Sequence, residues 1–318
     1  MSNINQLKQI ANNLVSKGKG ILAADESNPT CKKRFDSIGA NASFETRNEY
    51  RDMLLTADGI EDFISGVILF DETLRQSTTC EKKISFTQIL NSKGIIAGIK
   101  VDQGIITLEG FENEKVTTGL DGLDKRLLEY YDLGARFAKW RAVITIGDCM
   151  PSDACIYANA HSLARYASKC QQAGIVPIVE PEVLMNGTHT IGECNLVTNK
   201  VLNVVFEQLK MYNVLLEGII LKPNMVISGI DCPVQAGVEE VANLTYACLK
   251  KNVPINVPGI AFLSGGQSGD LATLHLNRMN QNNSNTPWNQ SVKIFEFSDN
   301  WENTRKNIKD AFNKKFEV

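Results

Sequence analysis

Eight short apolar runs, separated by stretches with helical periodicity, constrain the fold of this chain more than any other feature. Most of the runs are nearly continuous rows of apolar residues, without the alternation of a strand that has one wet face. Continuous runs of this length are typical of parallel strands covered on both faces. The runs occupy residues 20–25, 64–70, 95–102, 137–143, 176–182, 218–224, 259–266 and 292–298.

The stretches between these runs predict amphipathic helices. From Ile156 to Cys170, apolar side chains recur at alternating steps of four and three residues, which places them on one helix face. Ser152 stands where an N-cap is needed, and Gly174 stands where a left-handed residue ends a helix. Further stripes predict helices at residues 123–131, 202–209 and 301–312, and an additional N-terminal helix that carries Ile4, Leu7, Ile10 and Leu14.

Strands that are each followed by a helix predict an α/β protein: a single (β/α)8 barrel, or TIM barrel, over residues 1–318 with an extra N-terminal helix. No stretch rich in Pro, Gly or Ser divides the chain, and the Asn-rich residues 280–289 are expected to form a surface loop. The alternative is a doubly wound open sheet. That fold needs fewer strands and a glycine-rich first turn, which the sequence lacks.

The composition excludes several classes of partner. Hydrophobic residues make up 43% of the 318 residues and charged residues 22%, so there is ample material for a folded core. The 33 basic and 36 acidic residues give a net charge of −3, which offers no electrostatic basis for binding nucleic acid or an anionic membrane. The sequence shows neither a secretory signal pattern nor a run of about 18 apolar residues that would span a membrane.

The placement of cysteine and histidine argues against disulfides and a metal centre. The eight cysteines are scattered without a C-x-x-C pair, so reduced thiols in the cytoplasm are expected. His161, His189 and His275 are far apart, and no H-x-H or H-E-x-x-H spacing occurs. We therefore expect no metal and no cofactor, although separated ligands could converge in the fold.

Ionisable residues stand at the carboxyl ends of five apolar runs, where a buried strand would not carry them. Where two occur in one run they are two residues apart, so they share a face of the strand. Solvent exposure explains one such pair equally well. Five charged strand ends favour a common pocket, because these ends meet at the active-site face of a barrel. The cations are Lys100, Lys139, Arg141 and Lys222, and the anions are Asp25, Asp102, Glu180 and Glu182.

Four cations facing four anions make a balanced polar cluster whose chemistry suits a carbonyl substrate. A lysine among other cations and apolar walls loses its proton more readily, and its free amine can attack a ketone. The resulting iminium accepts electrons when an adjacent C–C bond breaks. Two carboxylates in different environments can divide the acid and base roles, and extra cations suit a phosphate. The residues alone therefore predict Schiff-base chemistry on a sugar phosphate.

Two further clusters fit the same pocket. The seventh run ends in Leu-Ser-Gly-Gly-Gln-Ser, whose backbone N–H groups at Ser264, Gly265 and Gly266 can approach an anion. A glycine-rich turn is, however, more often only a turn. The first run is followed by hydroxyls and cations, which could equally be the first turns of an exposed helix. They are Ser27, Thr30, Lys33 and Arg34.

At these residues the chain resembles the class I fructose-1,6-bisphosphate aldolases. The matching segments follow the family's order from about residue 18 to residue 268. The resemblance implies a metal-free lyase of glycolysis and gluconeogenesis, a homotetramer that cleaves fructose 1,6-bisphosphate reversibly to dihydroxyacetone phosphate and glyceraldehyde 3-phosphate. The segments are GKGILAADES, LLTADGIEDFISGVILFDETL, GIKVDQG, TTGLDGL, FAKWR, LARYASKCQQAGIVPIVEPE, LEGIILKPNM and GIAFLSGGQS.

The resemblance also implies a role for each matching site residue. Lys222 would be the Schiff-base lysine, and Lys139, supported by Arg141, would be the cation that depresses the pKa of its amine. Glu180 would be the general acid/base, and Glu182 would help to form and hydrolyse the imine. Asp25 would contact the substrate hydroxyl at the scissile bond. One phosphate falls to Ser264 and Gly265, with Gly266 and Ser298 in the same phosphate-binding set, and the other to Ser27, Thr30, Lys33, Arg34 and Lys100.

The resemblance breaks after the seventh strand. Family members have a strand there that ends in Phe-Ser-Tyr-Gly-Arg or Phe-Ser-Phe-Gly-Arg, whose arginine holds the phosphate of the dihydroxyacetone half. Here Ser298 is followed by Asp299, and the nearest arginine, Arg305, lies about two helical turns further on. The family's C-terminal tail, which ends in a tyrosine, has no counterpart in this sequence.

Two interpretations of this departure are open. In the first, the chain is a working aldolase with a weaker phosphate clamp, since one lost charge-assisted contact costs about 1.5–3 kcal/mol. In the second, it is an aldolase-like barrel that acts on a ketose monophosphate or has only a binding role. The complete set of chemical residues favours the first interpretation.

Overall fold

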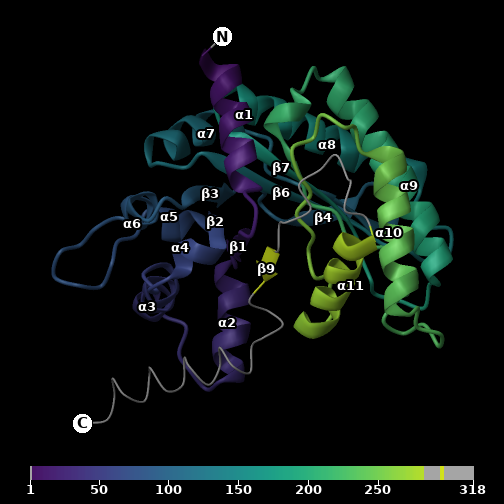
Figure 1. Ribbon diagram of the computed structural model, residues 1–318, viewed down its shortest axis with the longest axis horizontal. Coiled ribbons are helices and arrows are strands. Elements are labelled where there is room, and N and C mark those ends of the chain that lie inside the picture. The colour runs from purple at the N-terminus through teal and green to yellow at the C-terminus, as the bar shows by residue number, and fades with distance from the viewer. Residues whose placement is uncertain (1, 283–293, 297–318) are drawn as a thin grey trace.

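A computed structural model, which describes residues 2–282 and 294–296, contains a curved sheet of parallel strands with helices around it (Figure 1). The strands are hydrogen-bonded in the order β8-β7-β6-β3-β2-β1-β9, and all neighbours in this sheet are parallel. This order follows when strand–helix units wind in one direction about a common axis. The strands are β1 (Gly20–Ala24), β2 (Ile64–Leu69), β3 (Ile96–Lys100), β6 (Phe137–Ile144), β7 (Val176–Val183), β8 (Ile220–Leu221) and β9 (Ile294–Glu296).

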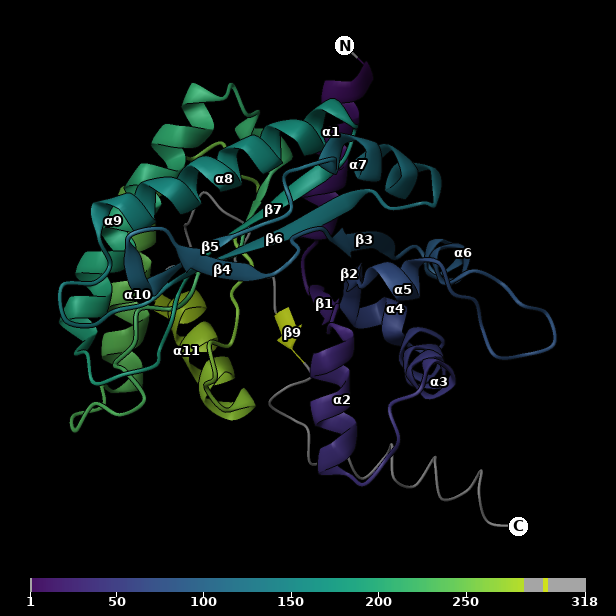
Figure 2. The same cartoon turned by 180° about the vertical axis from the view of Figure 1, so that it is seen from behind.

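Helices connect and cover the strands, and two long ones, α8 and α9, pack side by side over β6 and β7 (Figure 2). As the sequence predicts, α8 begins after Ser152, whose hydroxyl accepts a hydrogen bond from the Cys155 N–H, and a left-handed Gly174 follows its end. The helices are α1 (Ser2–Leu14), α2 (Asn28–Ser37), α3 (Phe44–Leu55), α4 (Ile60–Phe63), α5 (Asp71–Leu74), α6 (Phe86–Ser92), α7 (Leu123–Asp132), α8 (Asp153–Gln172), α9 (Ile191–Met211), the 3-10 turn η1 (Leu216–Gly218), α10 (Val238–Asn252) and α11 (Gly269–Asn282).

The prediction of a regular strand at residues 259–266 is wrong. Ile260 makes only an isolated bridge to Leu221, supported by a 2.8 Å hydrogen bond from the Ala261 N–H to the Leu221 carbonyl. The ladder cannot extend far, because Pro223 has no N–H to donate and Gly265 turns left-handed with φ of 62°. The predicted strand at 292–298 is present as β9, while Ser298 and the predicted helix at 301–312 lie outside the described residues.

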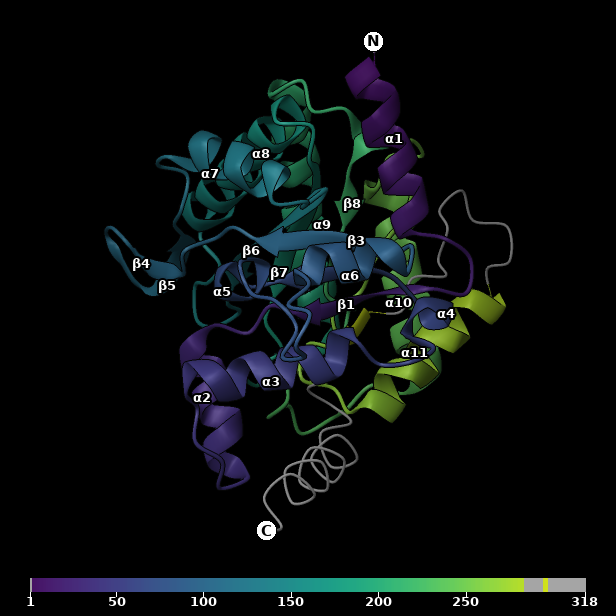
Figure 3. The same cartoon turned by 90° about the vertical axis from the view of Figure 1, so that its left-hand side faces the viewer.

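An apolar plug fills the end of the barrel at which the strands begin. Helix α1 lies against the strands at this end (Figure 3). Its buried residues, among them Leu14, pack against inward-facing strand residues such as Phe137, Ile178 and Ile220. Successive inward-facing positions along a strand are two residues apart. The next inward positions after Phe137, Ile178 and Ile220 are therefore Lys139, Glu180 and Lys222. The apolar end of the barrel thus supports a charged layer directly above it.

An antiparallel hairpin, β4 (Ile105–Leu108) and β5 (Phe111–Thr117), follows β3 in the chain and lies beside β6 and α8 (Figure 2). It is not predicted from the sequence. β4 is exposed, so its residues lack the buried pattern by which the other strands are recognised. The hairpin docks on α8 through Glu114, whose carboxylate accepts a 2.7 Å hydrogen bond from the Ser152 N–H. The loop expected at residues 280–289 does not begin at residue 280, because α11 continues to Asn282, and residues 283–289 lie outside the described residues.

Gly98 in β3 lies against Phe137 too closely for a larger residue. A Cβ atom at Gly98 would lie 2.3–2.5 Å from carbons of the Phe137 ring, which is fully buried. We expect Gly98→Ala to lower the free energy of unfolding by about 1–3 kcal/mol, because the ring must leave its packed position. Urea denaturation measures this loss.

Gly192→Ala is the matched control for this substitution. A Cβ atom there would meet only the Thr190 hydroxyl, at 3.8 Å, and alanine is a better helix former than glycine in α9. The control should leave stability unchanged or raise it by up to about 1 kcal/mol. An equal loss in both variants would contradict the packing argument.

Candidate active site

A cavity of about 1010 Å³ opens at the carboxyl ends of the strands. Charged side chains from five strand ends reach it, as the pattern of charged strand ends predicts. The cavity is lined by thirteen of the residues singled out from the sequence, which are Asp25, Ser27, Thr30, Arg34, Lys100, Asp102, Lys139, Arg141, Glu180, Glu182, Lys222, Gly265 and Gly266.

Lys222 lies at the centre of the site, directly after β8, and is only 1% exposed. Its Nζ atom is 2.8 Å from Oε1 of Glu180 on β7. The other carboxylate oxygen of Glu180 lies 3.5 Å from Nζ of Lys139 on β6, and this ammonium is 2.8 Å from Oδ2 of Asp25. Anions and cations thus alternate in the order Asp25, Lys139, Glu180, Lys222.

The charges of this row hold Asp25 and Lys139 in their ionised forms. Burial alone would raise the pKa of Asp25, but Lys139 and Lys222 outweigh burial and lower it below its usual value. Burial alone would lower the pKa of Lys139, but Asp25 and Glu180 outweigh it and raise that pKa well above its usual range. Lys139 is therefore a permanent cation in the site.

Glu182 lies two residues beyond Glu180 on the same face of β7, towards the carboxyl end of the strand. Burial raises the pKa of Glu182, and the ion pair with Arg141 offsets this only in part. Arg141, whose side chain is 42% exposed, contacts Glu182 where Lys139 contacts Glu180. Arg141 lies two residues beyond Lys139 along β6 and therefore reaches the outer of the two carboxylates, while its expected support of Lys139 stays a prediction.

Polar groups gather at one side of the cavity, around β1, β3 and α2. The hydroxyls of Ser27 and Thr30 are 3.0 Å apart, and Nζ of Lys100 is 2.5 Å from Oδ1 of Asp102. Arg34 pairs with the carboxylate of Glu26. The remaining predicted anion contacts differ: the exposed Lys33 does not line the cavity, Ser264 is buried beside it, and Ser298 lies outside the described residues.

Glu26 is a site residue that is not predicted from the sequence. It follows Asp25, so it points to the other side of the strand end, away from the barrel axis. Its carboxylate contacts Arg34, lies 2.5 Å from Nη1 of the buried Arg51 on α3, and accepts a hydrogen bond of 3.2 Å from the Tyr50 hydroxyl. Glu26 therefore fastens α2 and α3 to the end of β1.

The wall formed by α5 and α7 is also not predicted. It contributes Asp71, Arg75, Arg126, Glu129 and Tyr130 to the cavity. These residues lie on or directly after helices with ordinary charged faces, so nothing in their spacing distinguishes them from solvated side chains.

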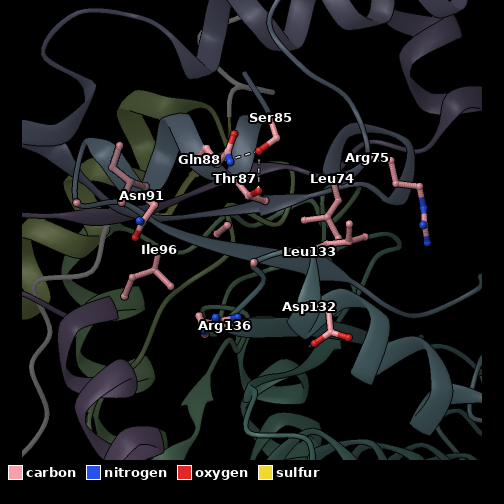
Figure 4. Close-up of a pocket in the computed structure, with 14 residues that line it drawn as sticks. Leu74, Arg75, Ser85, Thr87, Gln88, Asn91, Ile96, Asp132, Leu133 and Arg136 are labelled. Atoms are coloured by element: carbon pink, nitrogen blue, oxygen red, sulfur yellow. Dashed lines mark hydrogen bonds between the residues drawn. The ribbon is translucent and has the colours of Figure 1, made fainter. Parts of the chain in front are cut away.

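A second cavity, of about 570 Å³, lies between α6 and the start of β3 (Figure 4). Arg75 lines both cavities, at one side of this one. The hydroxyl of Ser85 here accepts a hydrogen bond from the Gln88 N–H and lies 3.3 Å from the Thr87 hydroxyl. None of the described residues predicted for the site lines this cavity, so the cavity above Lys222 is the candidate active site.

Residues 2–282 and 294–296 contain no group of three or more His, Cys, Asp and Glu side chains that could hold a metal ion. Over the same ranges, no helix has both the length and the apolar character needed to cross a membrane.

The fold and the site define an α/β-barrel enzyme whose candidate active site holds a buried lysine paired with a carboxylate. Comparison with known proteins gives the family: residues 6–310 match the family model described as fructose-bisphosphate aldolase class-I, glycolytic. The chain therefore belongs to the class I fructose-bisphosphate aldolase family, whose members are lyases. The resemblance noted in the sequence is confirmed over nearly the whole chain.

Individual relatives agree with this assignment. The chain is 54% identical over 285 residues, 90% of its length and 84% of the relative's, to the probable fructose-bisphosphate aldolase class 1 of Xanthomonas axonopodis pv. citri. It is 50% identical over 278 residues, 87% of its length and 76% of the relative's, to fructose-bisphosphate aldolase 1 of Toxoplasma gondii.

A solved structure confirms the predicted fold class. The fructose-bisphosphate aldolase of Plasmodium falciparum, solved in complex with TRAP and a small-molecule inhibitor, superposes with a TM-score of 0.89 at 47% sequence identity. The match covers 92% of this chain and 84% of the other. The lack of a regular strand around Ile260 is therefore compatible with an α/β TIM barrel.

The buried row of charges makes a prediction about stability and pH. Lys139→Met leaves Asp25 and Glu180 without their shared cation, and should lower the free energy of unfolding at pH 7 by about 3–5 kcal/mol. In the native protein the pKa of Asp25 lies below its unfolded value, so its stabilising contribution is present at neutral pH and is lost as the pH falls. In the variant, burial raises that pKa, so the penalty shrinks on acidification.

Urea denaturation at pH 7 and pH 5 measures both effects. The stability difference between the wild type and Lys139→Met should be smaller at pH 5 than at pH 7. Lys169→Met, which removes a half-exposed lysine 3.5 Å from Asp124, is the control and should cost less than about 1 kcal/mol. A difference that is constant or grows on acidification would refute the charge argument.

Proposed function

We propose that this protein cleaves fructose 1,6-bisphosphate reversibly to dihydroxyacetone phosphate and glyceraldehyde 3-phosphate through a Schiff base on Lys222. One observation carries the proposal: the buried Lys222 amine lies 2.8 Å from Glu180, which also contacts the permanent cation Lys139. Glu180 can accept a proton from Lys222, and the positive charge retained on Lys139 disfavours a second cation nearby. Both effects favour the free amine that attack on a ketone requires.

In the proposed reaction, Glu180 takes a proton from the Lys222 ammonium, the free nitrogen attacks the C2 carbonyl of the substrate, and Glu180 returns that proton to the C2 oxygen to give a carbinolamine. Glu182, whose pKa is raised by burial, then passes a proton from the carbinolamine nitrogen to the departing hydroxyl, and water leaves as the iminium forms. Asp25 binds the C4 hydroxyl, and Glu180 takes its proton. The C3–C4 electron pair then moves to the iminium, which becomes an enamine as glyceraldehyde 3-phosphate departs. Protonation at C3 and hydrolysis release dihydroxyacetone phosphate and regenerate Lys222.

Two sets of polar groups in the cavity suit a substrate with a phosphate at each end. In the first set, Gly265 and Gly266 have φ of 62° and 82°, a conformation in which backbone N–H groups can approach an anion. In the second set, Ser27, Lys100 and Arg34 supply a hydroxyl and two cations. Arg34 can turn from Glu26 to a phosphate without leaving that carboxylate unpaired, because Arg51 remains on it.

We further propose that the chain is one domain that assembles into a homotetramer and acts in the cytoplasm, in glycolysis and gluconeogenesis. The family description as glycolytic supports the pathway, and the eight free cysteines suit a reducing compartment. Strongly exposed apolar side chains such as Leu196 and Met211, more than 70% exposed, offer surface for subunit contacts.

Trapping the covalent intermediate tests the central claim. Borohydride added with dihydroxyacetone phosphate should reduce the imine and leave one stable mass adduct on Lys222, located by peptide mass spectrometry. Lys222→Met should give no adduct and less than about a thousandth of the cleavage rate, because the nucleophile is gone. Lys210→Met, on the exposed face of α9, is the control and should be trapped normally. A folded wild type without an adduct on Lys222 would overturn the proposal.

Comparing bisphosphate with monophosphate cleavage tests the substrate class. We expect kcat/KM for fructose 1,6-bisphosphate to exceed that for fructose 1-phosphate by about 10- to 150-fold, since one charge-assisted phosphate contact is worth about 1.5–3 kcal/mol. Coupled assays of the two products measure both rates. Equal values, or a preference for the monophosphate, would support the alternative of a ketose-monophosphate lyase.

A further inference from the structure

Arg126, in the first turn of α7, lines the active-site cavity, and two of its guanidinium nitrogens donate hydrogen bonds to backbone carbonyls. One guanidinium nitrogen, Nη1, donates to the carbonyl of Val101 at 2.9 Å. The other, Nη2, donates to the carbonyl of Gly119 at 2.5 Å. Arg126 thus joins two segments that are 18 residues apart in the chain, the end of β3 and the turn before α7.

Val101 occupies a critical place because it stands between Lys100 and Asp102. Its side chain is fully buried, and its N–H donates to the carbonyl of Lys139 at 3.0 Å. Because Arg126 holds the carbonyl of Val101, the peptide groups on both sides of this residue are hydrogen-bonded. Lys100 in turn contacts both the carboxylate and the carbonyl of Asp102, at 2.5 and 3.0 Å. The direction of the Lys100 side chain therefore depends on this short stretch of backbone.

The second segment held by Arg126 closes the base of the β4–β5 hairpin. The Gln103 N–H donates to the carbonyl of Thr118 at 2.9 Å, and the Thr118 N–H donates to that of Gly104 at 2.9 Å. Gly119 has φ of 121°, and a Cβ atom there would lie 3.2 Å from the Val101 carbonyl oxygen. The two carbonyls that Arg126 binds consequently lie side by side, and the planar guanidinium bridges them with one N–H group to each.

A network of charges holds α7, and with it Arg126, against α5. Arg75 contacts Glu129 at 2.5 Å and Asp71 at 3.0 Å. Tyr130, one turn beyond Arg126, interacts with both Asp71 and Arg126. Burial would raise the pKa of Asp71, but Arg75 and Tyr130 lower it, so this carboxylate stays ionised at neutral pH. The helix from which the Arg126 side chain extends is therefore held in place, as are the two carbonyls that its guanidinium binds.

We propose that Arg126 is a positioning residue that holds Lys100 in place for the phosphate of the aldehyde half, the phosphate that fructose 1-phosphate lacks. It acts through the Val101 carbonyl and does not touch the reacting atoms. This inference rests on the proposed function. Its consequence is that loss of Arg126 weakens binding of one phosphate and leaves the chemistry at Lys222 intact.

Steady-state kinetics with two substrates test the assignment. Arg126→Gln should raise KM for fructose 1,6-bisphosphate about 10-fold while kcat changes by less than about twofold, because the lost interaction serves binding alone. KM for fructose 1-phosphate should change by less than about twofold. Arg126→Lys, which can keep one of the two hydrogen bonds, should show an intermediate KM. Lys125→Gln removes an exposed charge from the same helix and should match the wild type.

A double-mutant cycle separates this role from general destabilisation. In a Lys100→Met background, Arg126→Gln should raise KM by less than about twofold, because the group that it positions is already gone. A full 10-fold effect in that background would refute the proposal, as would an equal rise in KM for both substrates or a fall in kcat alone. If Arg126→Gln does not fold, Arg126→Lys carries the same comparison.

The two proposals fail in different ways. A wild type that turns over neither substrate would refute the proposed function. Calorimetric binding of fructose 1,6-bisphosphate would then test Arg126 directly, with the same 10-fold loss of affinity expected in Arg126→Gln. Unchanged affinity in that variant would overturn the inference whether or not the protein is an aldolase.

Discussion

The structure depends on a buried row of alternating charges in which Lys139 lies between Asp25 and Glu180 and Glu180 also contacts Lys222. Removing an ion from water costs several kcal/mol, so no member of the row could be buried alone. Each inner member has an opposite charge on both sides, and the row as a whole is neutral. Three adjacent strand ends and β1 must therefore keep their register, because a slip of one residue would turn these side chains out of the barrel.

The same two-residue alternation explains why the row sits on an apolar plug. Inward positions near the strand starts, such as Phe137 and Ile178, pack with α1, and the next inward positions are charged. Because Gly98 provides the space that the Phe137 ring occupies, the plug is dense directly below Lys139. Water is thereby excluded from beneath the lysines, and the charges interact more strongly than they would at a surface.

The strand ends that converge on the site could be predicted from the sequence, since charged residues that end apolar runs meet wherever parallel strands close into a barrel. The β4–β5 hairpin could not be, because an exposed strand has no burial pattern. Lys33 lies on the same helix as Arg34, but it is exposed and outside the cavity, so its role at a phosphate rests on the resemblance alone. Glu26 and Arg126 escape prediction because their significance lies in long-range contacts, to Arg51 and to Val101, that no local spacing records.

These missed residues share a physical role that differs from that of the strand residues. Strand ends are held by a ladder of backbone hydrogen bonds and can carry groups whose position must not vary, such as Lys222. The segments that follow the strands lack a ladder, so their backbone groups need other partners. Arg51 supplies one to the carbonyl of Glu26 after β1, and Arg126 supplies one to that of Val101 after β3. In both places a guanidinium on a helix holds the backbone one or two residues beyond the end of the strand, beside the candidate active site.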